Sequence, residues 1–432
     1  MNSVLLPPEC VRGMVSLNES VFKKIVKVPV LNIEGLNLIN CITTSLKQYL
    51  LKLENFKSVQ CNKNNEKIIY LNPDLVSCFR SFNDDVVATL TSLNIFENRL
   101  TFCEITLTFD NWKAHEIIAA ILPPCYSFSG FSVIGTIIHV NLKNELLSYK
   151  HIIAEVLLKK LKYYKSVVNK INNIENTFRN FEMEILAGSN DLKTEVKENG
   201  CKFELNFREV YWNPRLHEEH AKIVNKLNQG DVLYDVCCGI GPFSIPAAKC
   251  GCEVLANDLN PACCKWLQRN VIINKINSRL KIFNKPGDEF IKEDIKNDIL
   301  KHVTNDKNDS IRFHITMNLP ASAYTFLPVF VGLFNENELS IFEEHHLPII
   351  HLYCFMKNSN NFKEEAKALI EETLNVSDIC YLEIRNVRNV APNKEMIRIS
   401  FAMNKKILGK TAENNKHYIE NESHFDAKRL KL

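Results

Sequence analysis

Glycines and acids set at fixed spacing are the residues of this chain best placed to do chemistry. The run from Asp235 to Gly241 reads DVCCGIG, and Asp258 comes nineteen residues after Gly239. Two glycines let the backbone turn sharply beneath a ligand, and an acid at this distance accepts hydrogen bonds from ribose hydroxyls in nucleotide-binding α/β folds. The pattern therefore predicts a strand, a turn, a helix and a second strand around an adenosine-type cofactor.

The residues after the second glycine indicate which adenosine cofactor fits. Dinucleotide-binding turns carry a third small residue, which lets helix and strand pack closely around a pyrophosphate. Here Pro242 and Phe243 follow Gly241, and no basic residue stands nearby for a phosphate. The turn therefore favours S-adenosylmethionine over NAD. A glycine turn that merely connects strand and helix is the third interpretation.

A second candidate group follows an apolar run. Residues 311–317 predict the fourth strand of a doubly wound sheet, and Asn318 and Pro320 come directly after it. Ligands bind at the carboxyl ends of such strands, and a proline two residues on stiffens the turn that carries the amide. Asn318 is thus placed to hold a nucleobase edge beside the methyl donor, although Asn-x-Pro is also common in ordinary turns.

Length and composition set the wider limits. A chain of 432 residues can hold two or three domains. Its 46% hydrophobic and 24% charged residues are ordinary for a soluble globular protein. The net charge is only +3, so contact with nucleic acid needs local basic patches. The sequence shows neither an apolar run long enough for a membrane span nor a clear N-terminal targeting signal, so we expect a cytoplasmic protein without membrane contact.

The fifteen cysteines are scattered along the chain. Cys250-Gly-Cys252 is the only pair with close metal-ligand spacing, and no second pair or histidine motif accompanies it. We therefore expect reduced thiols and no metal site.

Apolar periodicity also predicts elements before the glycine turn. Alternation at residues 100–109 predicts a half-buried strand, and residues 111–121 predict a helix that Pro123 ends. Residues 132–142 predict another strand and 149–161 a second helix. Lysines cluster after Glu155 and could contact phosphate or form a solvated face: Lys159, Lys160, Lys162, Lys165 and Lys170.

Several motifs in one order along most of the chain carry a resemblance. They are Pro7–Met14, His139–Leu142, Val167–Lys170, Asn176–Gly188, Tyr211–Leu216, the glycine turn, Asn318–Ala321 and Val390–Met396. In this order the chain resembles the eukaryotic and archaeal tRNA (guanine-N1)-methyltransferases, which methylate the guanosine just 3′ of the anticodon, at position 37. The resemblance implies an α/β fold: a Rossmann-like class I S-adenosylmethionine methyltransferase domain with a doubly wound, mostly parallel sheet, preceded by small α+β N-terminal and middle domains.

The resemblance also implies domain limits and partners. An N-terminal tRNA-recognition domain is expected at 1–97, a middle α+β domain at 98–200, the methyltransferase domain at 201–403, and a polar, disordered tail at 404–432. S-adenosylmethionine is the implied cofactor. The implied partner is tRNA, contacted at its anticodon stem-loop and body by a monomer. The sequence leaves nuclear and mitochondrial pools open beside the cytoplasmic one.

Guanine N1 carries a proton, so its lone pair cannot attack a methyl sulfonium until that proton is removed. By resemblance, Glu219 is the general base and Arg179 donates to the developing charge on O6. Asn318 holds the guanine edge and Pro320 its backbone. Without the resemblance, Glu218 and Glu219 would be interpreted as solvated helix acids and Arg179 as a member of a structural ion pair.

For the cofactor, the resemblance implies a set of contacts. They are Asp235, Gly239, Gly241, Asp258, Leu259 and Asn318, with His220 near the methionine end. The family usually shows an acid followed by glycine after the third strand, to hold adenine. Here Pro286 stands before Gly287 and Asp288 follows, so adenine is held either by a shifted Asp288 or by backbone groups.

Three other functions stay open. A sister family of the same fold transfers the aminocarboxypropyl group of the same cofactor to a tricyclic tRNA base. Methylation of an exocyclic base nitrogen favours Asn-Pro-Pro-aromatic, whereas Leu319 and Ala321 stand here. A non-catalytic RNA-binding module would not need the intact glycine turn and Asp258.

Overall fold

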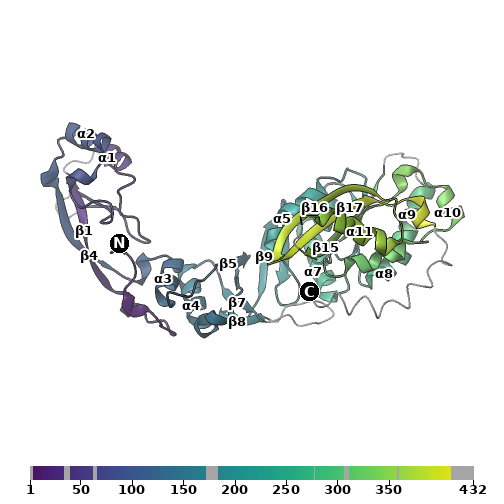
Figure 1. Ribbon diagram of the computed structural model, residues 1–432, viewed down its shortest axis with the longest axis horizontal. Coiled ribbons are helices and arrows are strands. Elements are labelled where there is room, and N and C mark those ends of the chain that lie inside the picture. Colours follow the sequence, from purple (N-terminus) through teal and green to yellow (C-terminus); the bar gives the residue numbers. More distant parts are fainter. Residues whose placement is uncertain are drawn as a thin grey trace. The chain divides into compact units, whose positions relative to one another are not determined.

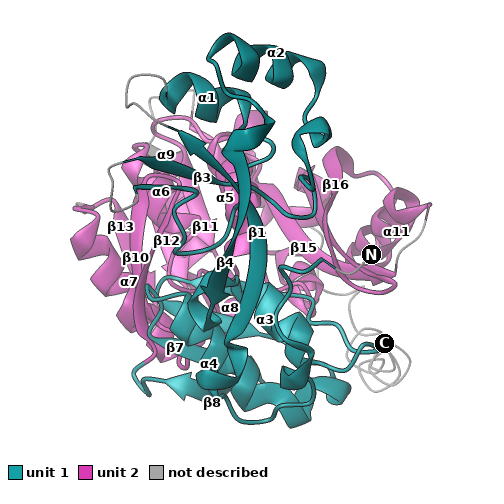
Figure 2. Cartoon of the chain, turned by 90° about the vertical axis from the view of Figure 1, so that its left-hand side faces the viewer, with its two compact units in different colours: residues 1–171, 183–191 teal, residues 172–182, 192–432 magenta. Residues whose placement is uncertain are grey.

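The computed structural model describes residues 3–33, 39–61, 66–171, 183–276, 278–305, 311–357 and 360–409. The chain forms two compact units, shown in different colours in Figure 2. Unit 1 comprises residues 1–171 and 183–191, and unit 2 comprises residues 172–182 and 192–432. The domain limits expected near residues 97, 200 and 403 stay a prediction.

The first sheet of unit 1 has the order β2-β3-β1-β4. Its strands are β1 (Lys24–Ile33), β2 (Val59–Cys61), β3 (Lys67–Tyr70) and β4 (Leu100–Leu107). Helices α1 (Ile39–Ser45) and α2 (Asp84–Ser92) lie beside β1 (Figure 1) and share a hydrophobic core with it. Because β4 pairs along β1, this sheet extends to residue 107.

The second sheet of unit 1 has the order β5-β6-β7-β8. Its elements are β5 (Phe131–Ile134), β6 (Ile137–Val140), β7 (Ser166–Lys170) and β8 (Met183–Gly188), with helices α3 (Ala114–Ile121) and α4 (Lys150–Lys160). The single strand predicted at 132–142 is wrong. It is a hairpin, because the chain reverses at Gly135, whose φ of +54° suits glycine.

Unit 2 contains a seven-stranded sheet with the order β13-β12-β11-β14-β15-β17-β16. Its strands are β11 (Val232–Asp235), β12 (Glu253–Asn257), β13 (Leu280–Phe283), β14 (Phe313–Met317), β15 (Ile349–Lys357), β16 (Cys380–Ala391) and β17 (Lys394–Ala402). Strands β11 to β15 pair in parallel, while β17 and β16 are antiparallel. Figure 1 shows β15, β17 and β16 side by side. The expected Rossmann-like, mostly parallel α/β fold is confirmed, with β14 as its fourth strand.

The helices of unit 2 lie before, between and after these strands. They are α5 (His217–Val224), α6 (Ser244–Lys249), α7 (Pro261–Ile273), α8 (Gly287–Phe290), α9 (Lys296–Asn305), α10 (Glu336–Ser340), α11 (Phe362–Leu374) and α12 (Lys405–Leu408). A hairpin of β9 (Lys193–Glu198) and β10 (Cys201–Asn206) precedes α5. Helix α12 falls in the segment expected to be a disordered tail, yet Ile407 and Leu408 are buried in the core. Residues 410–432 lie outside the described part.

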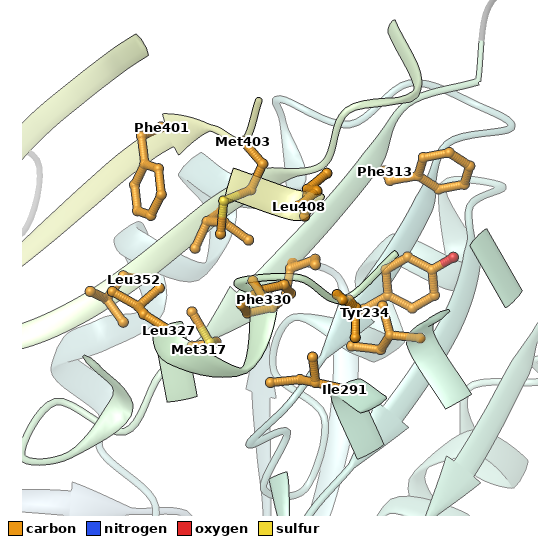
Figure 3. Packing of buried hydrophobic residues seen from close by; sticks show 14 of the residues in the cluster. Tyr234, Ile291, Phe313, Met317, Leu327, Phe330, Leu352, Phe401, Met403 and Leu408 are labelled. Atoms are coloured by element: carbon orange, nitrogen blue, oxygen red, sulfur yellow. The ribbon is translucent and has the colours of Figure 1, made fainter. Parts of the chain in front are cut away.

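One face of the sheet in unit 2 packs against an apolar core. Figure 3 shows Tyr234 of β11, Met317 of β14, Leu352 of β15 and Phe401 of β17 around Phe330. Side chains alternate along a strand, so the residues between these ones lie on the opposite face. Within the described residues, no helix is long and apolar enough to cross a membrane.

The opposite face carries an unusual line of polar residues, called the polar row below. In register across β11, β14, β15, β17 and β16 it consists of Asp235, Thr316, His351, Ser400 and Glu383. All but Glu383 are buried. Buried polar groups need partners, and two pairs within the row supply them: Thr316 donates to Asp235, and His351 lies 2.9 Å from the Ser400 hydroxyl.

Candidate active site

The glycine turn between β11 and α6 has the geometry that the sequence predicts. Gly239 and Gly241 have φ angles of +55° and +95°, values that favour glycine. A Cβ on Gly241 would also come within 2.5 Å of the Leu267 Cδ1 atom. Both glycines are therefore required for the turn itself.

Asp258 follows β12 and faces this turn. Its Oδ2 accepts a hydrogen bond from the Gly239 N–H at 2.8 Å, and its Oδ1 accepts one from the Asn260 N–H at 2.9 Å. Burial raises the pKa of Asp258 despite these bonds. The acid thus fastens the turn, a role that the sequence did not indicate. The Cys263 thiol also donates to this carboxylate, and the lone pair that is left can accept from a ribose hydroxyl.

Asp235 lies fully inside unit 2. Its Oδ2 accepts from the Ser244 hydroxyl at 2.6 Å, and its Oδ1 accepts from the Thr316 hydroxyl at 2.9 Å. Burial raises the pKa of Asp235 to about 7. The carboxyl therefore ties β11 to α6 and β14, which fixes the base of the glycine turn from within.

The segment after β13 carries the predicted adenine contacts. Asn284 donates through Nδ2 to the Asp258 carbonyl oxygen at 2.7 Å and so joins the ends of β12 and β13. Gly287 is buried, and a Cβ there would lie 3.0 Å from Val236 Cγ1. Asp288 is half-exposed in the first turn of α8, with the Lys292 ammonium 3.9 Å away.

The neighbouring positions Leu259 and Pro286 are more open. Leu259 is 44% exposed beside Asp258, and Pro286 is the half-exposed residue that precedes α8. An apolar side chain at this edge could cover one side of an adenosine.

Glu219 of α5 is buried, unlike its exposed neighbour Glu218. Its Oε1 accepts from Arg398 Nη1 at 2.6 Å and from the Tyr353 hydroxyl at 3.1 Å. The interpretation of Glu219 as a solvated helix acid is therefore wrong. A buried carboxylate needs such partners to remain charged.

His220 is the next residue on α5 and is also buried. Its Nδ1 lies 2.5 Å from Glu198 Oε1 on β9, and its ring meets the edge of Phe243, which follows the glycine turn. An acid on one ring nitrogen fixes the imidazole's orientation. Glu198 was missed because it lies in a hairpin rich in charged residues.

Asn318 and Pro320 follow β14 and are half-buried. Within the described residues, the Asn318 amide makes no hydrogen bond, so it is available to a ligand. The Pro320 carbonyl accepts from the Phe355 N–H at 2.9 Å, which attaches this turn to β15. Because β14 lies beside β11, the turn and the glycine turn leave the same edge of the sheet.

Predicted residues thus occur together in unit 2, on the ends of β11, β12 and β14 and on α5. Arg179 lies outside the described residues. Arg398 and Tyr353 were missed, because each lies in a strand that is far from α5 in the sequence. Within the described chain, no cluster of three or more metal-binding side chains occurs.

Family models match two consecutive stretches of the chain. A model of the TRM5/TYW2 methyltransferase domain matches residues 194–373, and a model of the TYW2 N-terminal domain matches residues 115–191. Together they cover parts of both units.

Two solved structures have a similar fold. Trm5b from Pyrococcus abyssi superposes with a TM-score of 0.57 at 22% identity, covering 87% of this chain and 98% of its own. The aTrm5 chain of a complex with tRNALeu gives a TM-score of 0.59 at 23% identity, covering 88% and 100%. At this level of identity the likeness establishes the fold.

Relatives with much higher identity extend over nearly the whole chain. A tRNA (guanine(37)-N(1))-methyltransferase of Anopheles darlingi is 43% identical over 414 residues, covering 95% of this chain and 80% of the relative. The protein of that name from Homo sapiens is 38% identical over 412 residues, also covering 95% and 80%. The chain therefore belongs to the family of tRNA (guanine(37)-N(1))-methyltransferases.

Proposed function

We propose that this protein transfers the methyl group of S-adenosylmethionine to N1 of guanosine 37 in tRNA. The observation that carries the proposal is the 43% identity to a relative of this activity over 95% of the chain. The monomeric state, the contact with the anticodon stem-loop and the cytoplasmic location expected from the sequence stay predictions.

The residues around the glycine turn fit the cofactor. Asp258 can accept from the ribose hydroxyls while its other lone pairs hold the turn, and Leu259 can cover the sugar. The glycines leave room for the methionine part, and His220 lies nearby with its ring fixed by Glu198. When bound, S-adenosylmethionine supplies the electrophilic methyl group.

Adenine can be held in either of two ways. Asp288 is half-exposed and only loosely paired with Lys292, so its carboxylate could turn towards an amino group. Alternatively, backbone groups near Pro286 and Gly287 hold the base. Asp288→Ala distinguishes the two, because it lowers the affinity for the cofactor only if the Asp288 carboxylate holds adenine.

The reaction needs one proton to leave N1 and charge on O6 to be stabilised. Glu219 takes the proton, because its carboxylate is held by one oxygen and buried away from water. Arg179 donates to O6. Asn318 offers a free amide to the guanine edge, and Pro320 stands on a turn fixed to β15. The N1 lone pair then accepts the methyl group.

Substitution of Glu219 tests this proposal most directly. With both ligands saturating, Glu219→Gln should slow single-turnover methyl transfer by roughly 10²–10⁴-fold, the usual contribution of a general base. The acid limb of its pH–rate profile should vanish, since glutamine does not ionise. Glu218→Gln is the matched control, because Glu218 is exposed one residue away, and it should keep the wild-type rate.

Identification of the modified nucleoside separates the alternatives. Incubation with labelled cofactor and total tRNA should give 1-methylguanosine at position 37. An aminocarboxypropyl adduct would assign the chain to the sister chemistry, and binding of tRNA without any transfer would indicate a non-catalytic module.

A further inference from the structure

A buried arginine lies in the sheet of unit 2. Arg398 of β17 is fully buried and pairs in register with Tyr353 of β15. Its sequence neighbours Ile397 and Ile399 belong to the apolar core, so Arg398 faces the side of the polar row. A guanidinium in such a place is costly unless its charge is matched.

Two carboxylates match that charge. Arg398 Nη1 donates to Glu219 Oε1 and Nη2 lies beside Glu383 Oε2, each at 2.6 Å. Glu383 in turn accepts from the Lys226 ammonium at 2.7 Å. Four charges therefore alternate in sign from the buried Glu219 to the half-exposed Lys226 and Glu383. The chain of ion pairs is neutral as a whole.

Tyr353 adds a second donor to the same oxygen of Glu219. Its hydroxyl donates to Oε1 at 3.1 Å. Burial, together with the charge of Glu219, raises the pKa of Tyr353 well above its ordinary value, so the hydroxyl remains a donor. Among the described residues, none donates to Oε2. One oxygen of Glu219 is thus held twice, and the other keeps its lone pairs.

Other charged or titratable groups of α5 and of the strands that α5 contacts do not bond to Glu219. They are Glu218, His220 and Lys222 on α5, Glu198 on β9, and His351 on β15. Among the described residues, Arg398 is therefore the cation that is bonded to Glu219. A carboxyl this deeply buried favours its neutral form unless an opposite charge lies close, and a neutral carboxyl cannot accept the N1 proton.

We propose that Arg398 is a positioning residue for the reaction: it keeps Glu219 ionised and holds Oε1, which leaves Oε2 to take the proton from guanine N1. This inference rests on the proposed role of Glu219 as general base.

The test compares pH–rate profiles of full-length variants in single-turnover methyl transfer to tRNA. In Arg398→Met, which removes the charge at similar volume, the acid limb should move up by about 1–3 pH units, the effect expected for loss of an adjacent cation. At pH values below the acid limb, the methyl-transfer rate of the variant should be lower than that of the wild type, roughly tenfold for each pH unit of that shift. The equilibrium affinities for S-adenosylmethionine and for tRNA should stay within about twofold of wild type, because Arg398 acts only through Glu219.

Three further variants control the result. Arg398→Lys restores the charge and should return the limb towards the wild-type position. Arg269→Met breaks an ion pair with Glu204 at the surface of the same unit and should leave the profile unchanged. If Arg398→Met does not fold, Arg398→Gln takes its place, because glutamine also removes the charge while it keeps an amide donor. The acid limb should again move up in that variant.

Two outcomes overturn it. If Arg398→Met folds, binds both ligands and keeps the wild-type limb while Glu219→Gln loses it, Glu219 is the base and Arg398 only anchors α5 to the sheet. The same holds if Arg398→Gln is the variant that folds and it keeps the wild-type limb. If Glu219→Gln itself keeps the limb, the proposed base and the positioning role fall together.

Discussion

Single residues of this site carry two duties at once. Asp258 was expected to hold the ribose, and it also accepts from the Gly239 N–H that it faces. Asp235 was expected near the cofactor, and it ties three elements together from inside. An acid that both shapes a turn and contacts a ligand couples the local fold to binding.

Substitution of Asp258 separates these duties. Asp258→Ala should weaken binding of S-adenosylmethionine by about ten- to a hundred-fold, because a charged hydrogen bond is worth roughly 1.5–3 kcal/mol. The affinity for tRNA should change far less. Calorimetric titration with each ligand measures both.

Asp258→Asn is the matched variant, since its amide oxygen can still accept from Gly239. If the ribose contact dominates, asparagine should also lose affinity; wild-type affinity in this variant would mean that Asp258 serves the turn alone. Unchanged cofactor affinity in Asp258→Ala would contradict both roles.

Much of the residue-level site could be predicted because its signals are local. The glycines and Asp258 lie within about two dozen residues, and their spacing reflects one turn between two adjacent strands. Arg398, by contrast, is far from Glu219 in sequence, and nothing in the run IRISF marks its arginine as a partner. Contacts between distant strands depend on strand order, which spacing does not reveal.

At the scale of elements, the polar row also depends on strand order, which spacing along the sequence does not reveal. Strand β14 was predicted from its apolar run, and β15 is also mostly apolar, yet each carries polar residues at alternate positions. These residues meet because β14 pairs with β15, and Ser400 joins them because β17 lies between β15 and β16. That order brings Ser400 to 2.9 Å from His351, and β14 brings His314 to 3.1 Å from it.

The paired histidines predict acid sensitivity of unit 2. Burial lowers the pKa of His314 to about 4, and that of His351 well below its ordinary value. Between about pH 6.5 and 4 the unfolded chain therefore binds more protons than the folded one, so stability falls as the pH drops through this window. His314 alone should cost on the order of 3 kcal/mol at the acid end.

Chemical unfolding of His314→Asn and His351→Asn measures this effect. Each variant should lose less stability than the wild type between pH 7 and pH 4.5. His115→Asn is the control, because His115 is exposed on α3, and it should keep the wild-type slope. If the free energy of unfolding depends on pH equally in the wild type and the three variants, burial of the two histidines does not make unit 2 sensitive to acid.

At the scale of the whole molecule, the residues proposed for chemistry and for RNA contact fall in different units. Glu219, Asp258 and Asn318 belong to unit 2, whereas the lysines that cluster after Glu155 belong to unit 1. The structure divides those lysines further. Lys159 pairs with Glu19 at 2.6 Å, and Lys160 is buried against Glu54 at 2.9 Å.

Lys162 and Lys165 remain exposed and form no ion pair with a described residue. Tyr163 between them is 71% exposed, so this loop offers two cations and an aromatic ring to a phosphate backbone. Local charge of this kind is what a chain with a net charge of only +3 needs for RNA binding.

The double variant Lys162→Gln/Lys165→Gln should therefore weaken tRNA binding and make its dependence on salt shallower, by roughly 0.7–0.9 in log–log slope for each phosphate that the variant no longer neutralises. Affinity for S-adenosylmethionine and the single-turnover rate at saturating tRNA should not change, because unit 2 is untouched. Binding isotherms at several salt concentrations measure the slope.

Lys159→Gln, which removes a lysine already paired with acids, should keep the wild-type slope. A double variant with the wild-type slope would return these lysines to the role of a solvated surface, and a slower rate at saturating tRNA would show that unit 1 also contributes to the chemical step.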